Sequence, residues 1–119
     1  MMHCACDWDP PSVYRCAEHT AGTPQVCSEC GATIAPGECY EHVFGIWERV
    51  PDCFDTCCRC RALRDWVEAH VPCVCWQHGN LHDDCIQAAE HWAHHAPGLL
   101  FGTLRRAVLI QRHARSAQP

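Results

Sequence analysis

Hydrophobic positions follow a two-residue period in the first half of the chain. Between Cys39 and Phe54, aromatic and β-branched residues alternate roughly with polar ones, and Gly45 lies near the middle. Pro36-Gly37, just before this segment, suits the two central positions of a type II turn. A two-residue period places apolar side chains on one face of a strand, so the segment predicts a β-hairpin.

Further along, the period changes to that of a helix. Asp55 or Thr56 is a suitable N-cap for a helix that ends before Pro72. The residues of its predicted inner face are Leu63, Trp66, Val67 and His70. Cysteines occupy the first turn of this helix, so its beginning carries chemistry as well as structure.

Two more helices are predicted in the last third of the chain. Asn80 caps a helix over residues 81–96, with Asp83 at the capping-box position and Pro97-Gly98 beyond its end. Its apolar stripe consists of Leu81, Cys85, Ala88, Ala89 and Trp92. The final helix spans residues 99–115. Its wide apolar arc includes Leu100, Phe101, Leu104, Ala107 and Val108. Both stripes predict packing against the rest of the chain.

Composition indicates that the hydrophobic core alone is too small to stabilise the fold, so metal ions or disulfides must contribute. The chain has 119 residues, and its 48% of hydrophobic residues includes 13 cysteines. The N-terminal sequence M-M-H-C-A-C-D-W-D-P-P lacks the basic and apolar regions of a signal peptide, and no apolar run is long enough to cross a membrane. We therefore expect a cytoplasmic protein. In that reducing compartment, 13 cysteines and 10 histidines favour zinc over disulfides.

Two C-x2-C pairs predict a first zinc site. Cys27 and Cys30 lie in a tight turn followed by glycine, which is typical of a zinc knuckle. Cys57 and Cys60 are three residues apart on the first helical turn, so they share a face, and the positive end of the helix favours their thiolates. Cys58 points elsewhere, and we expect it to be a small buried hydrophobe. The four paired cysteines form a closed, structural site.

A knuckle, a hairpin and a cysteine pair on the first turn of a helix make up the treble-clef zinc finger, an α+β fold. The segment C-S-E-C-G-A-T-I-A-P-G-E-C-Y, Cys27 to Tyr40, resembles the opening of many treble-clef proteins. With C-D-W-D-P-P at residues 6–11 and W-Q-H-G at residues 76–79, the chain is similar over residues 4–90 to small, largely uncharacterised proteins of bacteriophages and prophages. The resemblance implies a small zinc-stabilised fold in a phage-like setting, and no particular activity.

Two C-x-C pairs, Cys4-Ala-Cys6 and Cys73-Val-Cys75, predict a second zinc ion. Residues i and i+2 of an extended chain share a side, so each pair can chelate, and bridging both pairs would anchor the N-terminal segment. Two local alternatives and a metal-free state remain open. The C-terminal alternative draws on Cys73, Cys75, His78, His82 and Cys85. The N-terminal alternative draws on Cys4, Cys6, Cys16 and His19.

These elements predict a single domain over residues 1–119. Its parts are an extended N-terminal segment (1–26), a treble-clef zinc core (27–70), a C-x-C loop with a helix (71–96), and a basic amphipathic C-terminal helix with a tail (97–119).

Charge is divided unevenly between the last helix and the rest. Residues 1–97 hold five arginines and 14 acidic residues, whereas residues 98–119 hold four arginines and no acid. The acidic body disfavours broad contact with a phosphate backbone. Arg105, Arg106 and Arg112 lie opposite the predicted apolar arc, and they are the candidate partner-binding residues. An acidic protein, a nucleic acid and a second copy of the chain remain open as partners.

These features favour a non-enzymatic zinc-binding interaction module with a protein partner, and with neither membrane nor small-molecule substrate. In the phage-like setting it would be an accessory protein, or an inhibitor of a host protein in the bacterial cytoplasm. The alternative is a zinc-finger regulator that binds nucleic acid through the Arg-bearing helix. The stretch H-G-N-L-H, His78 to His82, invites comparison with HNH nucleases. Cys57 and Cys60 occupy the helix positions where that fold needs other ligands, so we expect no enzyme.

Overall fold

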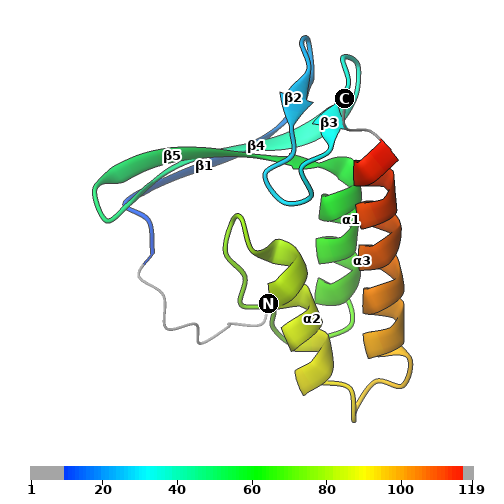
Figure 1. Cartoon of the computed structure of the whole chain (residues 1–119). Coiled ribbons are helices and arrows are strands. Elements are labelled where there is room, and N and C mark those ends of the chain that lie inside the picture. Colours follow the sequence, from blue (N-terminus) through cyan, green and yellow to red (C-terminus); the bar gives the residue numbers. More distant parts are fainter. Residues whose placement is uncertain (1–9, 117–119) are drawn as a thin grey trace.

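The structure, a computed structural model, describes residues 10–116 as a small α+β fold. These residues form a three-stranded sheet, a two-stranded sheet and three helices. Figure 1 shows the larger sheet extending away from the helices, which gather at one of its ends. None of the helices within residues 10–116 combines the length and apolar character needed to cross a bilayer.

The predicted hairpin is present and forms most of the larger sheet. Strand β4 (Cys39–Trp47) pairs in antiparallel fashion with β5 (Val50–Cys57). Glu48 and Arg49 connect them with φ angles of 50° and 69°. Two consecutive positive φ angles are the geometry of a tight hairpin turn, which matches the right-handed twist of the flanking strands.

The third strand lies where the sequence predicted only an extended segment. Strand β1 (Val13–Thr20) pairs with β4 along its whole length, from the partners Val13 and Ile46 to the partners Thr20 and Cys39. Most of its side chains are exposed, so it has no clear apolar face to reveal it in the sequence. Its pairing depends on backbone hydrogen bonds to β4, which a hydrophobic pattern does not report.

The smaller sheet frames the knuckle. Strands β2 (Gln25–Val26) and β3 (Thr33–Ile34) are antiparallel and lie on either side of residues 27–31. The backbone N–H of Cys27 also donates to the carbonyl of Ala32 at 2.9 Å. The turn that carries Cys27 and Cys30 is therefore closed by a short two-stranded ribbon.

The three predicted helices are present, with altered ends. Helix α1 (Cys58–Glu68) begins after Cys57 rather than after Asp55 or Thr56, both of which belong to β5. Helix α2 (Leu81–His91) ends before Ala96 because turns follow His91. Helix α3 (Leu99–Ser116) completes the bundle. Their shared core includes Leu63, Val67, Leu81, Cys85, Ala89, Leu99, Ala107 and Ile110.

The predicted apolar arc of α3 is wrong for Phe101, Leu104 and Val108, which face outward, whereas Ala107 is buried and Leu100 packs against the core. The helix buries Leu99, Gly102, Thr103, Ala107, Ile110 and Ala114. Small residues allow a close approach to α1: a side-chain carbon on Gly102 would overlap the Trp66 ring. The Arg106 guanidinium lies 3.8 Å from the centre of that ring, so Arg106 covers α1. Arg105 and Arg112 are exposed beside Phe101 and Val108, which are 71% and 47% exposed.

Candidate metal centre

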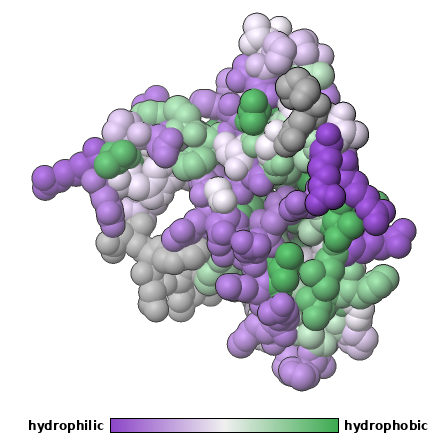
Figure 2. Space-filling model, in the orientation of Figure 1, coloured by the Kyte–Doolittle hydropathy of each residue, from purple (hydrophilic) through white to green (hydrophobic). Residues whose placement is uncertain are grey.

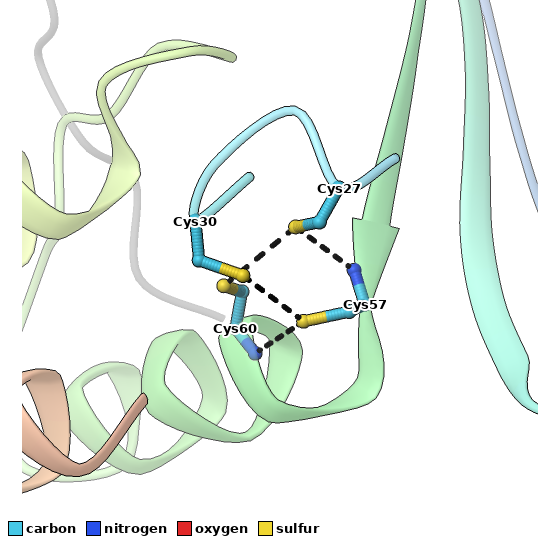
Figure 3. Close-up of side chains that lie close together, drawn as sticks. All are labelled: Cys27, Cys30, Cys57 and Cys60. Atoms are coloured by element: carbon cyan, nitrogen blue, oxygen red, sulfur yellow. Dashed lines mark hydrogen bonds between the residues drawn. The ribbon is translucent and has the colours of Figure 1, made fainter. Parts of the chain in front are cut away.

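Four cysteine sulfurs converge where the knuckle meets the junction of β5 and α1 (Figure 3). Sγ of Cys27 lies 3.8 Å from Sγ of Cys60, and Sγ of Cys30 lies 3.8 Å from Sγ of Cys57. All four sulfurs lie within 4.8 Å of one another. Zinc–sulfur bonds of about 2.3 Å in a tetrahedron place sulfurs about 3.8 Å apart. The spacing therefore fits one tetrahedral metal ion, which this group can hold.

The two halves of the site are joined through the backbone beside the ligands. The N–H of Ser28 donates to the carbonyl of Asp55 at 2.7 Å, and the N–H of Asp55 donates to Oγ of Ser28 at 3.0 Å. Gly31, at φ 77°, completes the knuckle turn, and its N–H donates to the carbonyl of Cys27 at 3.0 Å. These bonds fix the knuckle against the end of the hairpin.

Backbone N–H groups point at the sulfurs. Sγ of Cys27 accepts from the N–H groups of Glu29 and Cys57, both at 3.4 Å. Sγ of Cys57 accepts from the N–H of Cys60 at 3.5 Å, so the cysteine itself is the N-cap of α1. This explains why the predicted caps fail: Asp55 accepts instead from Nδ1 of His42 at 2.7 Å. N–H donors and the helix end both stabilise thiolates.

The four thiols differ in acidity because they share hydrogen bonds. Bonds from Cys30, Cys57 and Cys60 lower the pKa of Cys27 far below its ordinary value. Contacts with Cys27 and Cys30 raise the pKa values of both Cys57 and Cys60. A metal ion that binds all four sulfurs must therefore displace protons from these two thiols.

Two residues outside the cysteine set complete the surroundings of the site. His82, predicted as an alternative ligand of the second site, is buried and places Nε2 3.2 Å from Sγ of Cys60. Burial lowers the pKa of His82 below its usual value. Glu29, between the knuckle cysteines, accepts from the N–H groups of Gly79 and Leu81. Sequence reasoning missed Glu29, whose one signal was its place between two ligands.

Cys58 does not behave as predicted. Its side chain is exposed, whereas Cys57 and Cys60 on either side are fully buried. The helical turn that directs Cys57 and Cys60 at the knuckle leaves the intervening residue facing outward. The expectation of a small buried hydrophobe at Cys58 is therefore wrong.

The second predicted site lies partly outside the described residues. Sγ of Cys73 lies 3.6 Å from Sγ of Cys75, but Cys4 and Cys6 fall outside residues 10–116. The bridging site therefore stays a prediction.

The alternative ligands for the second site are dispersed in the structure. His78 stacks on Phe54, with ring centres 4.8 Å apart. Cys85 is fully buried in the helical core, and burial raises its pKa to about 12. Cys16 and His19 are exposed on β1, three positions apart and hence on opposite faces of the strand.

Comparisons of the chain with known protein families, curated proteins and solved structures gave no match. The resemblance to phage proteins therefore remains a prediction from the sequence. The chemistry of the site follows from its own geometry: four converging sulfurs can hold a metal ion in a small α+β fold.

Proposed function

We propose that the protein is a non-enzymatic interaction module of the treble-clef type, stabilised by zinc at Cys27, Cys30, Cys57 and Cys60. The observation that carries this proposal is the closed cysteine cluster. Three of its residues are almost fully buried, with exposed fractions of 2%, 0% and 0% for Cys27, Cys57 and Cys60. Four thiolates fill a tetrahedral coordination sphere, which leaves no position for a substrate or a reactive water. Soft sulfur ligands favour zinc over the hard cations.

The test of the metal proposal is native mass spectrometry of protein purified without added metal. We expect one zinc ion at the four-cysteine site of Cys27, Cys30, Cys57 and Cys60. A second ion is expected if Cys4, Cys6, Cys73 and Cys75 bind as predicted. A count of one excludes a second zinc ion, and a count of zero contradicts the proposal. The mass of the denatured chain, two hydrogens lower for each disulfide, identifies cysteines that are oxidised rather than metal-bound.

The outer face of α3 supports an interaction role. We use this name for Phe101, Leu104, Val108 and Leu109 with Arg105 and Arg112. The four apolar residues are exposed by 71%, 41%, 47% and 49%. Figure 2 shows hydrophobic residues gathered along the α3 side of the molecule, with strongly hydrophilic ones toward the C-terminal end. A helix that is apolar on its outer side as well as its inner side is usually covered by something.

Charge favours an acidic amphipathic segment of a partner protein as the occupant. Residues 98–119 contain four arginines and no acidic residue. Pairing α3 with α3 of a second copy would bring arginines together without a carboxylate to neutralise them. A nucleic acid is the alternative, which the arginines favour and the acidic body opposes. In the phage-like setting that the sequence suggests, the partner would be a host protein and the module an accessory protein or inhibitor.

A pair of labelled helical peptides tests this surface. Both carry leucines on one face, and one has glutamates beside them where the other has lysines. We expect the acidic peptide to bind and the basic one to fail. The Phe101→Ser/Val108→Ser double variant should weaken binding at least about tenfold, because burying each side chain contributes roughly 1.5–3 kcal/mol. Val26→Ser and Val50→Ser, at residues 64% and 62% exposed elsewhere, are matched controls.

Three results would contradict this choice of partner. Equal binding of both peptides would show that the arginines play no part. Dimerisation lost in the Phe101→Ser/Val108→Ser variant would identify a second copy as the occupant. A gel shift with DNA or RNA that fades steeply with salt and is lost in Arg105→Glu/Arg112→Glu would favour the nucleic-acid alternative.

A further inference from the structure

The beginning of α2 contacts both halves of the four-cysteine site, the knuckle and the β5–α1 junction, although none of the four cysteines lies on α2. From the knuckle, the Glu29 carboxylate accepts from the N–H of Gly79 at 2.7 Å and from the N–H of Leu81 at 3.0 Å. From α2, His82 directs Nε2 at Sγ of Cys60 at 3.2 Å. One residue thus joins α2 to the knuckle, and another joins it to the ligand on α1.

Glu29 supplies the cap that α2 lacks in its own sequence. Asn80, at the N-cap position, makes no side-chain capping bond, and its amide donates instead to Asp84 at 2.9 Å. The first N–H groups of a helix need acceptors, and a carboxylate is favourable at that positive end. Because Glu29 is flanked by two ligands, its carboxylate stays in place only while the knuckle keeps its turn.

His82 places a ring nitrogen beside the sulfur of Cys60. Backbone N–H groups reach the sulfurs of Cys27 and Cys57. At the sulfur of Cys60, the nitrogen within reach among the described hydrogen bonds is Nε2 of His82. A buried thiolate needs such donors, since it has left water behind.

The environment of the imidazole identifies which nitrogen carries the hydrogen. Nδ1 of His82 is buried and has no hydrogen-bond partner among the described residues. If the hydrogen is on Nε2, only a lone pair is left unpaired at Nδ1. In the metal-loaded site, where Cys60 is a thiolate, the other tautomer would bury an N–H without an acceptor and direct a lone pair at negative charge, which is worse on both counts.

We propose that His82 donates its Nε2–H to the Cys60 thiolate of the metal-loaded site, and that His82 and Glu29 together make the docking of α2 depend on the bound ion. This inference rests on the proposed metal binding at the four-cysteine site, and it does not depend on the proposed protein partner. The donor spreads the negative charge of four thiolates, and outer partners of this kind change metal affinity by about 10- to 100-fold. His82 is a positioning residue that acts through Cys60.

Competition for zinc against a chromophoric chelator tests the role of His82. We expect His82→Leu to lower the zinc affinity by about 10- to 100-fold. His82→Gln, which keeps an N–H donor, should recover most of that loss. Thr103→Val is the control, because Thr103 is a fully buried polar residue of α3 that bonds to Leu99. The zinc affinity of Thr103→Val should equal that of the wild type. A His82→Leu variant with wild-type zinc affinity would overturn the proposal.

Two measurements on the wild type hold even if His82→Leu fails to fold. Long-range ¹⁵N correlation spectra of the zinc-loaded protein should show the hydrogen on Nε2 of His82, and the Nδ1–H tautomer would overturn the assignment. Cobalt-substituted protein should show the charge-transfer intensity of four thiolates. A spectrum of three thiolates and one imidazole would make His82 a ligand, contrary to the proposal.

Hydrogen exchange of the zinc-loaded protein tests the dependence of α2. Glu29→Gln leaves one oxygen acceptor where the carboxylate had two, so amides of Leu81–His91 should exchange about tenfold faster. Zinc should stay bound, and α1 and α3 should keep their protection. Glu90→Gln, the same change at an exposed residue of α2, is the matched control. Equal exchange in both variants would overturn the role of Glu29, whereas a wild type that binds no metal would instead refute the proposed function.

Discussion

One short segment, residues 78–82, contacts two clusters of side chains that are stabilised by different interactions. We call them the metal corner and the aromatic corner. The metal corner contains Cys27, Cys30, Cys57, Cys60 and His82. The aromatic corner contains Tyr14, Trp47, Phe54, Trp76 and His78. His78 and His82 belong to the same stretch, H-G-N-L-H, yet they contact different corners. That stretch therefore connects two parts of the fold.

The difference lies in what each corner needs. In the aromatic corner, His78 stacks on Phe54 and its Nε2 lies 3.0 Å from the hydroxyl oxygen of Tyr14. Beside it, Arg64 and the buried Glu41 form a two-bond ion pair at 2.8 and 2.9 Å. None of these contacts involves a metal ion. The metal corner brings four sulfurs together, which is favourable only when an ion binds them. We therefore expect mutations to disrupt the two corners separately.

The largest effect should come from removing a ligand. Cys57→Ser or Cys60→Ser should lose the metal ion and most of the folded population, because binding of a structural zinc contributes on the order of 10 kcal/mol to folding. Cys58→Ser is the matched control, since Cys58 is exposed and should keep both the metal and the fold. Native mass spectrometry and circular dichroism check the outcome, and equal loss in all three variants would contradict the ligand assignment.

Acid should weaken the metal corner next most strongly. Cys57 and Cys60 have raised pKa values, so metal binding displaces a proton from each, and protons compete better as pH falls. With two protons displaced, and part of a third from Cys30, whose pKa is lowered to about 7, zinc affinity should fall at least about 100-fold for each pH unit between about pH 8 and pH 7. Chelator competition at several pH values measures the slope. An affinity independent of pH would show that the thiols are already ionised before metal binding.

Breaking the aromatic corner should cost stability but no metal. Phe54→Ala should lower the free energy of unfolding by about 2–3 kcal/mol, below the range for a fully buried ring because Phe54 is half-buried. Phe44→Ala, on the opposite face of the sheet, is the matched control and should cost less. Denaturant unfolding of the zinc-loaded variants measures both. Zinc release by Phe54→Ala in its folded state would show that the corners are not separable.

The smallest effect is expected within β4. A side-chain carbon on Gly45 would overlap the Trp47 ring, so Gly45→Ala should displace that ring and destabilise the fold by about 1–2 kcal/mol. Gly22→Ala is the control, because the added carbon meets nothing within 4 Å. Tryptophan fluorescence and thermal unfolding report the change. Unaltered fluorescence would mean that the indole does not lie over Gly45.

The parts that the sequence predicted are those whose signals are local. The C-x2-C spacings identified the cysteines that converge, and the change of hydrophobic period located the β4–β5 hairpin and the three helices. Strand β1 was not predicted because its partners in β4 lie 19 to 33 residues away and its side chains are mostly exposed. Pairing of that kind is decided by backbone hydrogen bonds.

The misassigned face of α3 has a similar cause. A helix with apolar residues on two sides offers two possible inner faces, and the hydrophobic pattern alone does not choose between them. Gly102 lies so close to the Trp66 ring of α1 that a side-chain carbon would overlap it, and the face that carries Gly102 turns inward while Phe101 and Val108 stay exposed. The roles of Glu29 and His82 could not be predicted either, since both depend on α2 folding back onto residues far away in the sequence.

Strand β5 connects the hairpin turn directly to the metal corner. The strand runs from Val50, beside the turn, to Cys57, whose sulfur belongs to the metal corner, and its eight residues span about 24 Å. Figure 1 shows the turn as the part of the hairpin farthest from the helices. A force applied at this tip would act on Cys57 through the backbone of β5, and the two hydrogen bonds between Ser28 and Asp55 would pass part of it to the knuckle. Strand β5 would thus connect a partner bound at the tip to the cysteines of the metal corner.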